Sequence, residues 1–335
     1  MPKGILLINL GTPDSASVSD VRKYLTEFLN DPRVIDISPI GRFLLVNLLI
    51  VPFRASKSAA MYQKIWTKEG SPLLIYGNEV KQQLQDRLGE NYVVELGMRY
   101  QQPSISSALE KLRKARVSDL TVLPLYPQYA SSSTGSSIEK VLEILQKWEV
   151  KPSLKIISKF YDQPDFIDAW VEVAKKYFLN DYDYFLFSYH GLPERHIQKA
   201  AAHYGNNTCL TENCCDKITN NNAYCYRAAC YETTRQLVKK LNLPEGKYST
   251  SFQSRLDDKW LKPYSDKVIE EKAKQGVKKM LVFSPAFVAD CLETLYEIGS
   301  EYDAIFRKHG GEKIQLVNSL NSHVAWIEAI KKIVQ

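Results

Sequence analysis

The stretch Ile5-Leu-Leu-Ile-Asn-Leu10 decides the fold class, because a short apolar run that turns polar at Gly11 is typical of a strand buried in a parallel sheet. Similar runs recur at residues 92–98, 120–125, 154–158, 184–188, 248–252, 280–284 and 314–318. Amphipathic, helix-like stretches, such as residues 257–275, lie between them. Strands that alternate with helices predict right-handed βαβ units. We therefore predict an α/β protein with two doubly wound halves and mostly parallel sheets.

Length and composition agree with two domains and exclude several classes of protein. At roughly 150 residues per domain, 335 residues make about two domains, which we place at 1–155 and 156–335. A last helix at 325–334 could pack against either half. A hydrophobic content of 44% with 24% charged residues is ordinary for a soluble protein. The net charge of +6 is spread along the chain, so we expect no nucleic-acid partner.

Neither apolar stretch of the N-terminal half predicts a membrane span. The first run is too short and wrongly flanked for a signal peptide, and residues 43–53 fall well short of the roughly 20 that a spanning helix needs. We expect a cytoplasmic protein. Residues 40–57 are bracketed by Arg42, Arg54 and Lys57, which suits docking on anionic lipid; a buried core helix is the alternative.

The usual nucleotide and hydrolase fingerprints are absent from the sequence. No G-x-G-x-x-G follows a strand, and there is neither a P-loop nor a G-x-S-x-G elbow. Dehydrogenase, P-loop ATPase and α/β-hydrolase functions therefore lose support, and the residues after each strand become the place to look for a site.

A histidine follows the predicted strand 184–188. Ser188-Tyr-His-Gly-Leu-Pro193 places His190 at the carboxyl end of that strand. Because imidazole ionises near about pH 6.5, His190 can take up and release protons at neutral pH. A simple loop hydrogen bond is the alternative, but the position favours a catalytic base, whereas we take His196 and His203 as surface residues.

Acidic side chains follow the predicted strand 280–284. At about 100° per residue, one narrow helical face carries Asp290, Glu293, Glu297 and Glu301. Repulsion between such neighbours raises some pKa values and suits a relay for protons or a divalent cation. A solvated acidic face remains the alternative for Glu297 and Glu301.

Two more segments have compositions that suggest binding. Residues 131–137 are rich in hydroxyl groups and lead into a helix, which suits an anion such as a substrate carboxylate, with helix capping as the alternative. Five of the six cysteines lie within residues 209–230, and such clustering in a reducing compartment points to metal or redox chemistry.

Six motifs in order resemble the ferrochelatase family from the first predicted strand to the last helix. They are Gly4-Ile-Leu-Leu-Ile-Asn-Leu-Gly-Thr-Pro13, Met98-Arg-Tyr100, Pro127-Gln-Tyr129, Ser188-Tyr-His-Gly-Leu-Pro193, Phe252-Gln-Ser254 and Asp290-Cys-Leu-Glu-Thr-Leu295. The resemblance implies insertion of Fe2+ into protoporphyrin IX, the last step of protohaem synthesis, in a cleft between two Rossmann-like domains.

The resemblance also implies roles for individual residues. His190 would accept the pyrrole protons, Glu293 would face it across the porphyrin, and Asp290 and Glu297 would continue an acidic path for the metal. The residues that would hold or contact the macrocycle are Arg33, Arg99, Tyr100, Tyr129, Ser131 and Trp260. Residues 40–57 would form a lip at the cleft mouth that contacts the membrane. Cys291 and Leu10 depart from residues that some members carry, which leaves the route of the metal open.

The cysteine-rich segment, about residues 205–230, resembles an insertion found in members that carry a 2Fe-2S cluster. Four thiolates satisfy such a cluster, and five are offered: Cys209, Cys214, Cys215, Cys225 and Cys230. We favour Cys209, one of the adjacent pair, Cys225 and Cys230, and a structural zinc is the competing interpretation.

Other functions stay open beside this one. They are coproporphyrin chelation, sirohydrochlorin chelation and a non-catalytic porphyrin or iron sensor on the same scaffold. We expect a monomer or homodimer that associates peripherally with the inner face of the cytoplasmic membrane.

Overall fold

A computed structural model describes residues 1–335 except 206–208 and 211–212, and the chain divides into two compact units. Unit 1 comprises Met1–Tyr126, Ala130–Ser158 and Ile330–Gln335. Unit 2 comprises Pro127–Tyr129 and Lys159–Ala329. Each unit has one sheet of four parallel strands, so the predicted fold class is confirmed.

The sheet of unit 1 has the strand order β2-β1-β3-β4. Its strands are β1 (Lys3–Gly11), β2 (Tyr92–Tyr100), β3 (Asp119–Pro124) and β4 (Ser153–Ile156). The helices are α1 (Val18–Leu29), α2 (Pro39–Leu44), α3 (Val51–Ile65), α4 (Pro72–Leu88), α5 (Ile105–Lys114) and α6 (Ser136–Leu145). Two π-helical segments adjoin them, η1 (Leu45–Ile50) and η2 (Ser131–Gly135).

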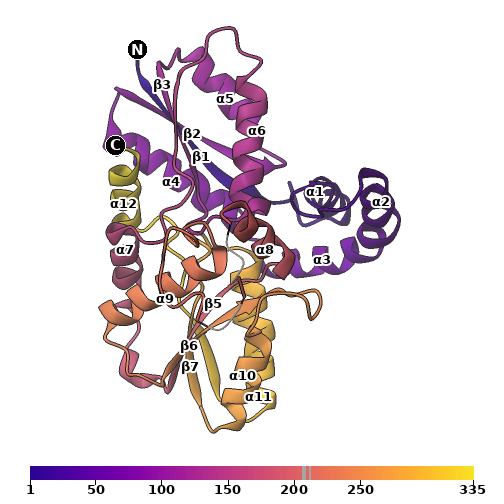
Figure 1. Cartoon of the computed structure of the whole chain (residues 1–335), viewed down its shortest axis with the longest axis vertical. Helices are drawn as coiled ribbons and strands as arrows, with labels where there is room; N and C mark the ends of the chain where they lie inside the picture. Colours follow the sequence, from indigo (N-terminus) through magenta and orange to yellow (C-terminus); the bar gives the residue numbers. More distant parts are fainter. Residues whose placement is uncertain (206–208, 211–212) are drawn as a thin grey trace. The chain divides into compact units, whose positions relative to one another are not determined.

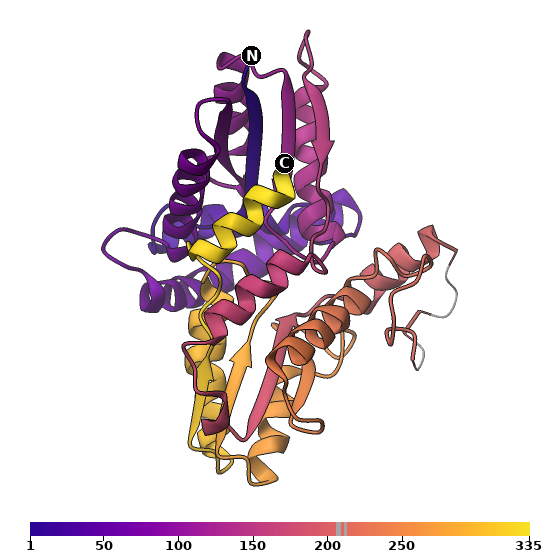
Figure 2. The same ribbon diagram turned by 90° about the vertical axis from the view of Figure 1, so that its left-hand side faces the viewer.

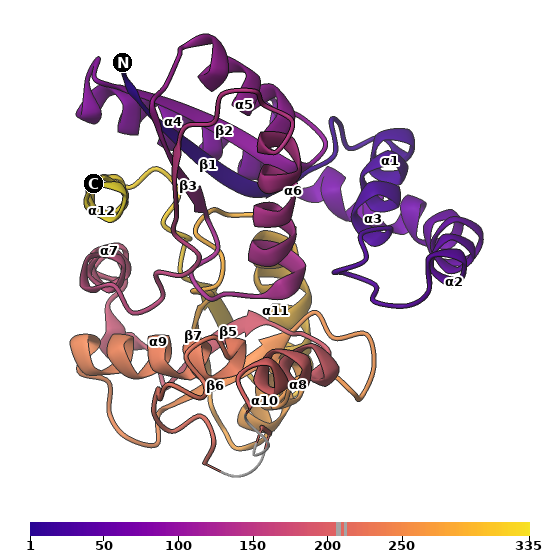
Figure 3. The same cartoon turned by 45° about the horizontal axis from the view of Figure 1, so that its top comes forward.

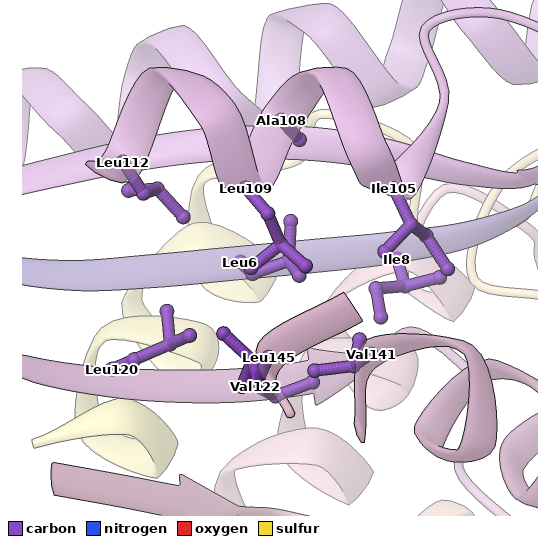
Figure 4. Close-up of a cluster of buried hydrophobic side chains, with 10 residues drawn as sticks. All are labelled: Leu6, Ile8, Ile105, Ala108, Leu109, Leu112, Leu120, Val122, Val141 and Leu145. Carbon is purple, nitrogen blue, oxygen red and sulfur yellow. The ribbon is translucent and has the colours of Figure 1, made fainter. Parts of the chain in front are cut away.

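Helices cover both faces of this sheet because β1 is apolar on both sides. Leu6 and Ile8 point toward α5 and α6, as Figure 4 shows. Helix α4 packs against β1 and β2 from the opposite face (Figure 3). Each fully buried leucine or isoleucine contributes roughly 1.5–3 kcal/mol of hydrophobic stabilisation.

The sheet of unit 2 has the strand order β6-β5-β7-β8. Its strands are β5 (Tyr184–His190), β6 (Tyr248–Gln253), β7 (Lys279–Phe283) and β8 (Lys313–Leu316). The helices are α7 (Pro164–Ala174), α8 (Glu194–His203), α9 (Tyr226–Leu241), α10 (Ser265–Lys274), α11 (Asp303–Lys308) and α12 (Val324–Val334), with a 3-10 turn η3 (Leu179–Asp181) and a π-helix η4 (Glu293–Tyr302).

Alternate residues of β5 face two different helical layers, and β5, β6 and β7 lie between α9 and α10 in Figure 1. Leu186 packs with α10 and η4, whereas Phe187 stacks on Phe283, which contacts Trp170 of α7. Because side chains alternate along a strand, His190 continues the face that η4 covers.

All eight predicted strands are present, with ends shifted by at most two residues, but one helical prediction needs correction. The helix-like stretch 257–275 becomes helical only at Ser265, because Pro263 cannot continue a helix. The last helix, for which the sequence left both halves open, is divided between them: Ile330–Gln335 groups with unit 1 and the residues before Ile330 with unit 2.

The apolar segment of unit 1 is longer than the sequence run indicated. Residues Pro39–Ile65 form one helix of 27 residues that is long and apolar enough to cross a membrane by length and composition alone. Only 28% of its apolar window is buried, so it is not a buried core helix, and one such helix is weak evidence for a span.

Candidate functional site

The strand ends of unit 2 bring the predicted base beside several polar groups. His190 ends β5 and is paired in register with Gln253, which ends β6. The Gln253 amide donates to the Glu293 carbonyl at 2.8 Å and to the Glu297 carboxylate at 3.2 Å. His190, Glu293 and Glu297 therefore lie at one edge of the same sheet.

A backbone contact sets the tautomer of the His190 imidazole. His190 Nδ1 lies 2.6 Å from the carbonyl oxygen of Gly191. Because a carbonyl oxygen only accepts hydrogen bonds, Nδ1 carries the proton, and Nε2 of the neutral ring is left with its lone pair. The imidazole is therefore arranged to accept a proton at Nε2.

Two aromatic rings flank His190. The ring centroid of Trp260 lies 6.5 Å and that of Phe287 6.2 Å from the imidazole centroid. A side chain at Gly191 would put its Cβ 2.6 Å from the Gln253 carbonyl oxygen, so only glycine permits this approach of the two strands. Trp260, predicted as a porphyrin contact, is thus a neighbour of the predicted base.

The Glu297 carboxylate accepts hydrogen bonds from four donors, of which Gln253 Nε2 is described above. Ser254 supplies its backbone N–H at 2.8 Å and its hydroxyl at 2.5 Å, and the Tyr302 hydroxyl lies 2.8 Å away. Ser254 adopts a φ of 61°, a left-handed conformation that is uncommon outside glycine and often found at functional sites. Burial raises the pKa of Glu297, and these hydrogen bonds and the nearby His190 oppose that rise.

Glu293 begins the π-helix η4, in which hydrogen bonds run from residue i to i+5. Burial, and then the nearby negative charge of Glu293, raises the pKa of the Cys291 thiol. The negative charge of Glu293 acts on Glu297, so the two carboxylates are electrostatic neighbours.

The expected helical stripe of four acids is wrong for Asp290, which lies before the helix. Glu293, Glu297 and Glu301 follow one another at spacings of four along the π-helix η4, which keeps residues four apart near one face. Both oxygens of Asp290 accept hydrogen bonds from within unit 2, from Thr294, Ser319 and Asn321. Glu301 is exposed.

Unit 1 has its own polar cluster around Asp31, which sequence reasoning missed. Asp31 Oδ2 accepts from Arg99 at 2.6 Å, from the Tyr100 hydroxyl at 2.9 Å and from the Ser136 hydroxyl at 2.5 Å. Arg99 also donates to Ser136, at 2.6 Å. Burial raises the pKa of Tyr100. The motif residues Arg99 and Tyr100 are thus held together by a carboxylate.

Arg33 and Ser131 also meet within unit 1. Arg33 donates to the Ser131 hydroxyl at 2.9 Å and pairs with Glu139 at 2.5 Å. Ser131 begins the π-helical turn η2, and Ser136, further along the hydroxyl-rich run, belongs to the Asp31 cluster. Ser131 and Ser136 therefore make tertiary contacts, and neither η2 nor α6 has a side-chain cap hydrogen bond.

The predicted porphyrin contact Tyr129 lies in unit 2 and packs against the cysteine-rich segment. Its ring meets Tyr224 edge to face, with centroids 5.6 Å apart, and Tyr224 stacks on Tyr204. The Lys159 ammonium lies 4.5 Å from the Tyr224 ring centroid. In Figure 2 the described part of this segment connects α8 to α9 at the right-hand edge.

Four of the five clustered thiols interact with one another. Cys214 Sγ and Cys215 Sγ lie 3.6 Å apart, and hydrogen bonding from Cys225 lowers the pKa of Cys209. Cys230 is fully buried, and burial raises its pKa. Arg227 donates to Cys215 Sγ at 3.3 Å.

The donor set fits a thiolate-bound metal by its chemistry, since soft thiolates select zinc and iron–sulfur clusters. Among the residues that the structure describes, no three His, Cys, Asp or Glu side chains are already arranged to hold a metal ion. All six cysteines are free thiols.

In unit 2, the site residues that the sequence missed sit in or beside recognised motifs. Gln253 and Ser254 belong to a quoted motif without an assigned role, and Phe287 and Tyr302 lie just outside the acidic run. Proximity to these motifs was the available signal in unit 2, whereas no motif marks Asp31 in unit 1.

Comparison with known proteins places the chain in a family. The family model described as Ferrochelatase matches residues 2–335. A ferrochelatase of Coxiella burnetii (strain Dugway 5J108-111) is 47% identical, covering 98% of this chain and 92% of the relative. A ferrochelatase of Legionella pneumophila (strain Lens) is 48% identical, covering 100% of this chain and 99% of the relative.

A solved structure supports the fold alone. SirB from Bacillus subtilis with Fe3+ has a TM-score of 0.53 at 11% identity, over 99% of this chain and 94% of SirB. The full-length family match and the two relatives, together with the motifs at the strand ends, assign this chain to the ferrochelatase family.

Proposed function

We propose that this chain inserts Fe2+ into protoporphyrin IX with His190 as the proton acceptor. Family membership makes it a chelatase that inserts Fe2+ into a porphyrin in haem synthesis. The reaction forms bonds from iron to four ring nitrogens and releases two pyrrole protons. The observation that carries the role of His190 is the Nδ1 contact to Gly191, which leaves Nε2 free to take one proton at a time.

Glu293 and Glu297 would bind the incoming metal ion and transfer protons. Carboxylate oxygens bind Fe2+ less tightly than thiolates do. Glu297 has a raised pKa and lies within electrostatic reach of His190, so it is suited to relay the proton that His190 releases. Because both oxygens of Asp290 are bonded within unit 2, we assign Asp290 to holding Thr294 and Asn321 in place.

The porphyrin contacts stay those that the resemblance implied. Arg33, Arg99 and Ser131 would bind propionate oxygens, as guanidinium and hydroxyl groups commonly do, and Tyr100, Tyr129 and Trp260 would contact the macrocycle. A cavity that favours a bent ring would expose the nitrogen lone pairs to the metal.

The test is anaerobic insertion of Fe2+, or of Zn2+, into protoporphyrin by the purified protein. We expect His190→Ala to abolish turnover and the matched variant His203→Ala, at the exposed end of α8, to retain it. Full activity in His190→Ala would remove the base from the scheme. Coproporphyrin in direct competition separates the two porphyrin substrates, and tight porphyrin binding without turnover would instead favour a sensor.

The cysteine-rich segment would hold a 2Fe-2S cluster through four of its five thiols. The support is the donor set: Cys209, one of Cys214 and Cys215, Cys225 and Cys230. Anaerobic purification with an absorption spectrum and metal analysis tests it. Iron with acid-labile sulfide supports the cluster, whereas one zinc per chain would establish the competing structural site.

The helix Pro39–Ile65 would dock on the inner face of the cytoplasmic membrane. Its exposed apolar side chains include Ile40, Phe43, Leu48, Leu49 and Phe53, and Arg42, Arg54 and Lys57 flank them. An amphipathic helix with this composition inserts into the interface of anionic bilayers.

A further inference from the structure

Two tyrosines flank Cys225, and both contact residues of the proposed site in unit 2. The Tyr226 hydroxyl donates to the backbone carbonyl of His190 at 2.8 Å. On the other side, the Tyr224 ring packs against Tyr129. The cysteine-rich segment is thereby joined to the proposed base through a residue adjacent to one of its thiols.

The contact with Tyr226 acts on the peptide that links His190 to Gly191. The N–H of this peptide donates to the Gln253 carbonyl at 2.8 Å, and its C=O accepts from Tyr226. The peptide plane is therefore held at both ends. The Gly191 carbonyl, which belongs to the following peptide, fixes the His190 tautomer. A change in the orientation of the His190–Gly191 peptide plane therefore moves this acceptor and changes the direction in which Nε2 points.

Tyr226 is itself tied to the thiols. It begins α9, and Cys225 is the cap residue before it, with its N–H bonded to the Asn222 carbonyl at 2.8 Å. The Cys225 thiol shares hydrogen bonds with Cys209 and Cys215. The Tyr226 side chain is only 6% exposed, so it has little freedom to absorb a shift of Cys225.

We propose that Tyr226 is a positioning residue for His190, and that it transmits the state of the Cys225 sulfur, free or metal-bound, to the base. This inference rests on the proposed function of His190. A metal ion that draws the Cys225 sulfur toward the other thiols moves the start of α9, and the Tyr226 hydroxyl carries that change to the peptide between His190 and Gly191.

Kinetics of Zn2+ insertion test the positioning role. Tyr226→Phe removes one hydroxyl and keeps the ring, and we expect kcat to fall about tenfold with an unchanged KM for porphyrin, the loss typical of one hydrogen bond. Tyr224→Phe is the matched control, because the contacts described for Tyr224 are made by its ring, and it should stay within about twofold of wild type. A wild-type kcat in Tyr226→Phe overturns the positioning role.

Hydrogen exchange at the Gly191 amide tests the coupling without turnover. In reduced, chelator-treated full-length protein without porphyrin, we expect added Zn2+ to change the exchange rate of this amide in wild type, but not in Cys225→Ser or Tyr226→Phe. No change in wild type, or the same change in Cys225→Ser, overturns the coupling. If Tyr226→Phe does not fold, Cys225→Ser carries this test alone.

The exchange experiment separates this inference from the proposed function. Retained chelation in His190→Ala would defeat the role of His190 as base, whereas the Gly191 amide reports the Tyr226 contact whether or not the imidazole is catalytic.

Discussion

Replacing Asp31 by alanine is the most informative single change in unit 1. The Asp31 side chain is 2% exposed and its partner Arg99 is 16% exposed, with 2.6 Å between Oδ2 and Nη2. The same oxygen accepts the hydroxyls of Tyr100 and Ser136. Alanine removes the only acceptor that all three donors share among the described contacts and leaves a partly buried guanidinium without its counter-charge.

The cost of this change follows from burial. Breaking a buried pair by deleting one partner destabilises a protein by roughly 3–5 kcal/mol, because the remaining charge stays desolvated. For a unit of this size, 1 kcal/mol lowers the Tm by roughly 2–4 °C. We therefore expect the Tm of Asp31→Ala to fall by roughly 6–20 °C, with Asp31→Asn in between because it keeps one acceptor oxygen.

Thermal unfolding followed by circular dichroism measures this shift. The matched control is Glu143→Ala on α6, whose carboxylate is 46% exposed and pairs with lysines at the surface, and which should move the Tm by less than about 2 °C. The double variant Asp31→Ala/Arg99→Met should recover part of the loss, since it removes the orphaned charge. A Tm of Asp31→Ala within about 2 °C of wild type would refute the reasoning.

Three further changes have defined outcomes. Gly191→Ala places a Cβ 2.6 Å from the Gln253 carbonyl oxygen, which must displace His190, and we expect loss of Zn2+ insertion in the chelation assay. In wild type, the pKa of Glu297 is raised above its ordinary value of 4.5. Between the ordinary and the raised pKa, the folded state therefore binds more protons than the unfolded state, so the free energy of unfolding falls as the pH rises through this range. Glu297→Gln cannot titrate at this position, so its free energy of unfolding should not show this fall. In urea unfolding from pH 4 to pH 8, the difference in stability between Glu297→Gln and wild type should shift in favour of the variant as the pH rises. Leu48→Asp/Phe53→Asp removes two exposed apolar side chains and should weaken binding to anionic vesicles at least about tenfold in a sedimentation assay.

Each of these changes has a control on the same chain. Gly299→Ala puts its Cβ at 3.8 Å from the Thr294 carbonyl oxygen, an ordinary contact, and should keep activity. Glu301→Gln, at an exposed position, should follow the wild-type pH profile. Phe178→Asp matches Phe53 in exposure, at 79%, and should leave vesicle binding unchanged. Equal losses in a variant and its control would contradict the corresponding prediction.

The strands and the place of the proposed base could be predicted from the sequence because both depend on local patterns. A buried parallel strand requires a short apolar run, and His190 follows such a run directly, so its position at the edge of a sheet was available from neighbouring residues alone. The family motifs lie at the same strand ends for the same reason.

The partners of these residues could not be predicted in this way. Asp31 and Arg99 are 68 residues apart, and Gln253 and Glu297 are 44 apart, so only the pairing of strands and the packing of helices bring them together. The acidic run was only partly predicted, since Asp290 lies before the helix and is bonded to Asn321, 31 residues away along the chain. By itself the sequence determined which residues lie at the strand ends, through local hydrophobic patterning; the hydrogen-bond partners that orient them were decided only by tertiary structure, because a contact between distant segments leaves no periodic signal in the chain.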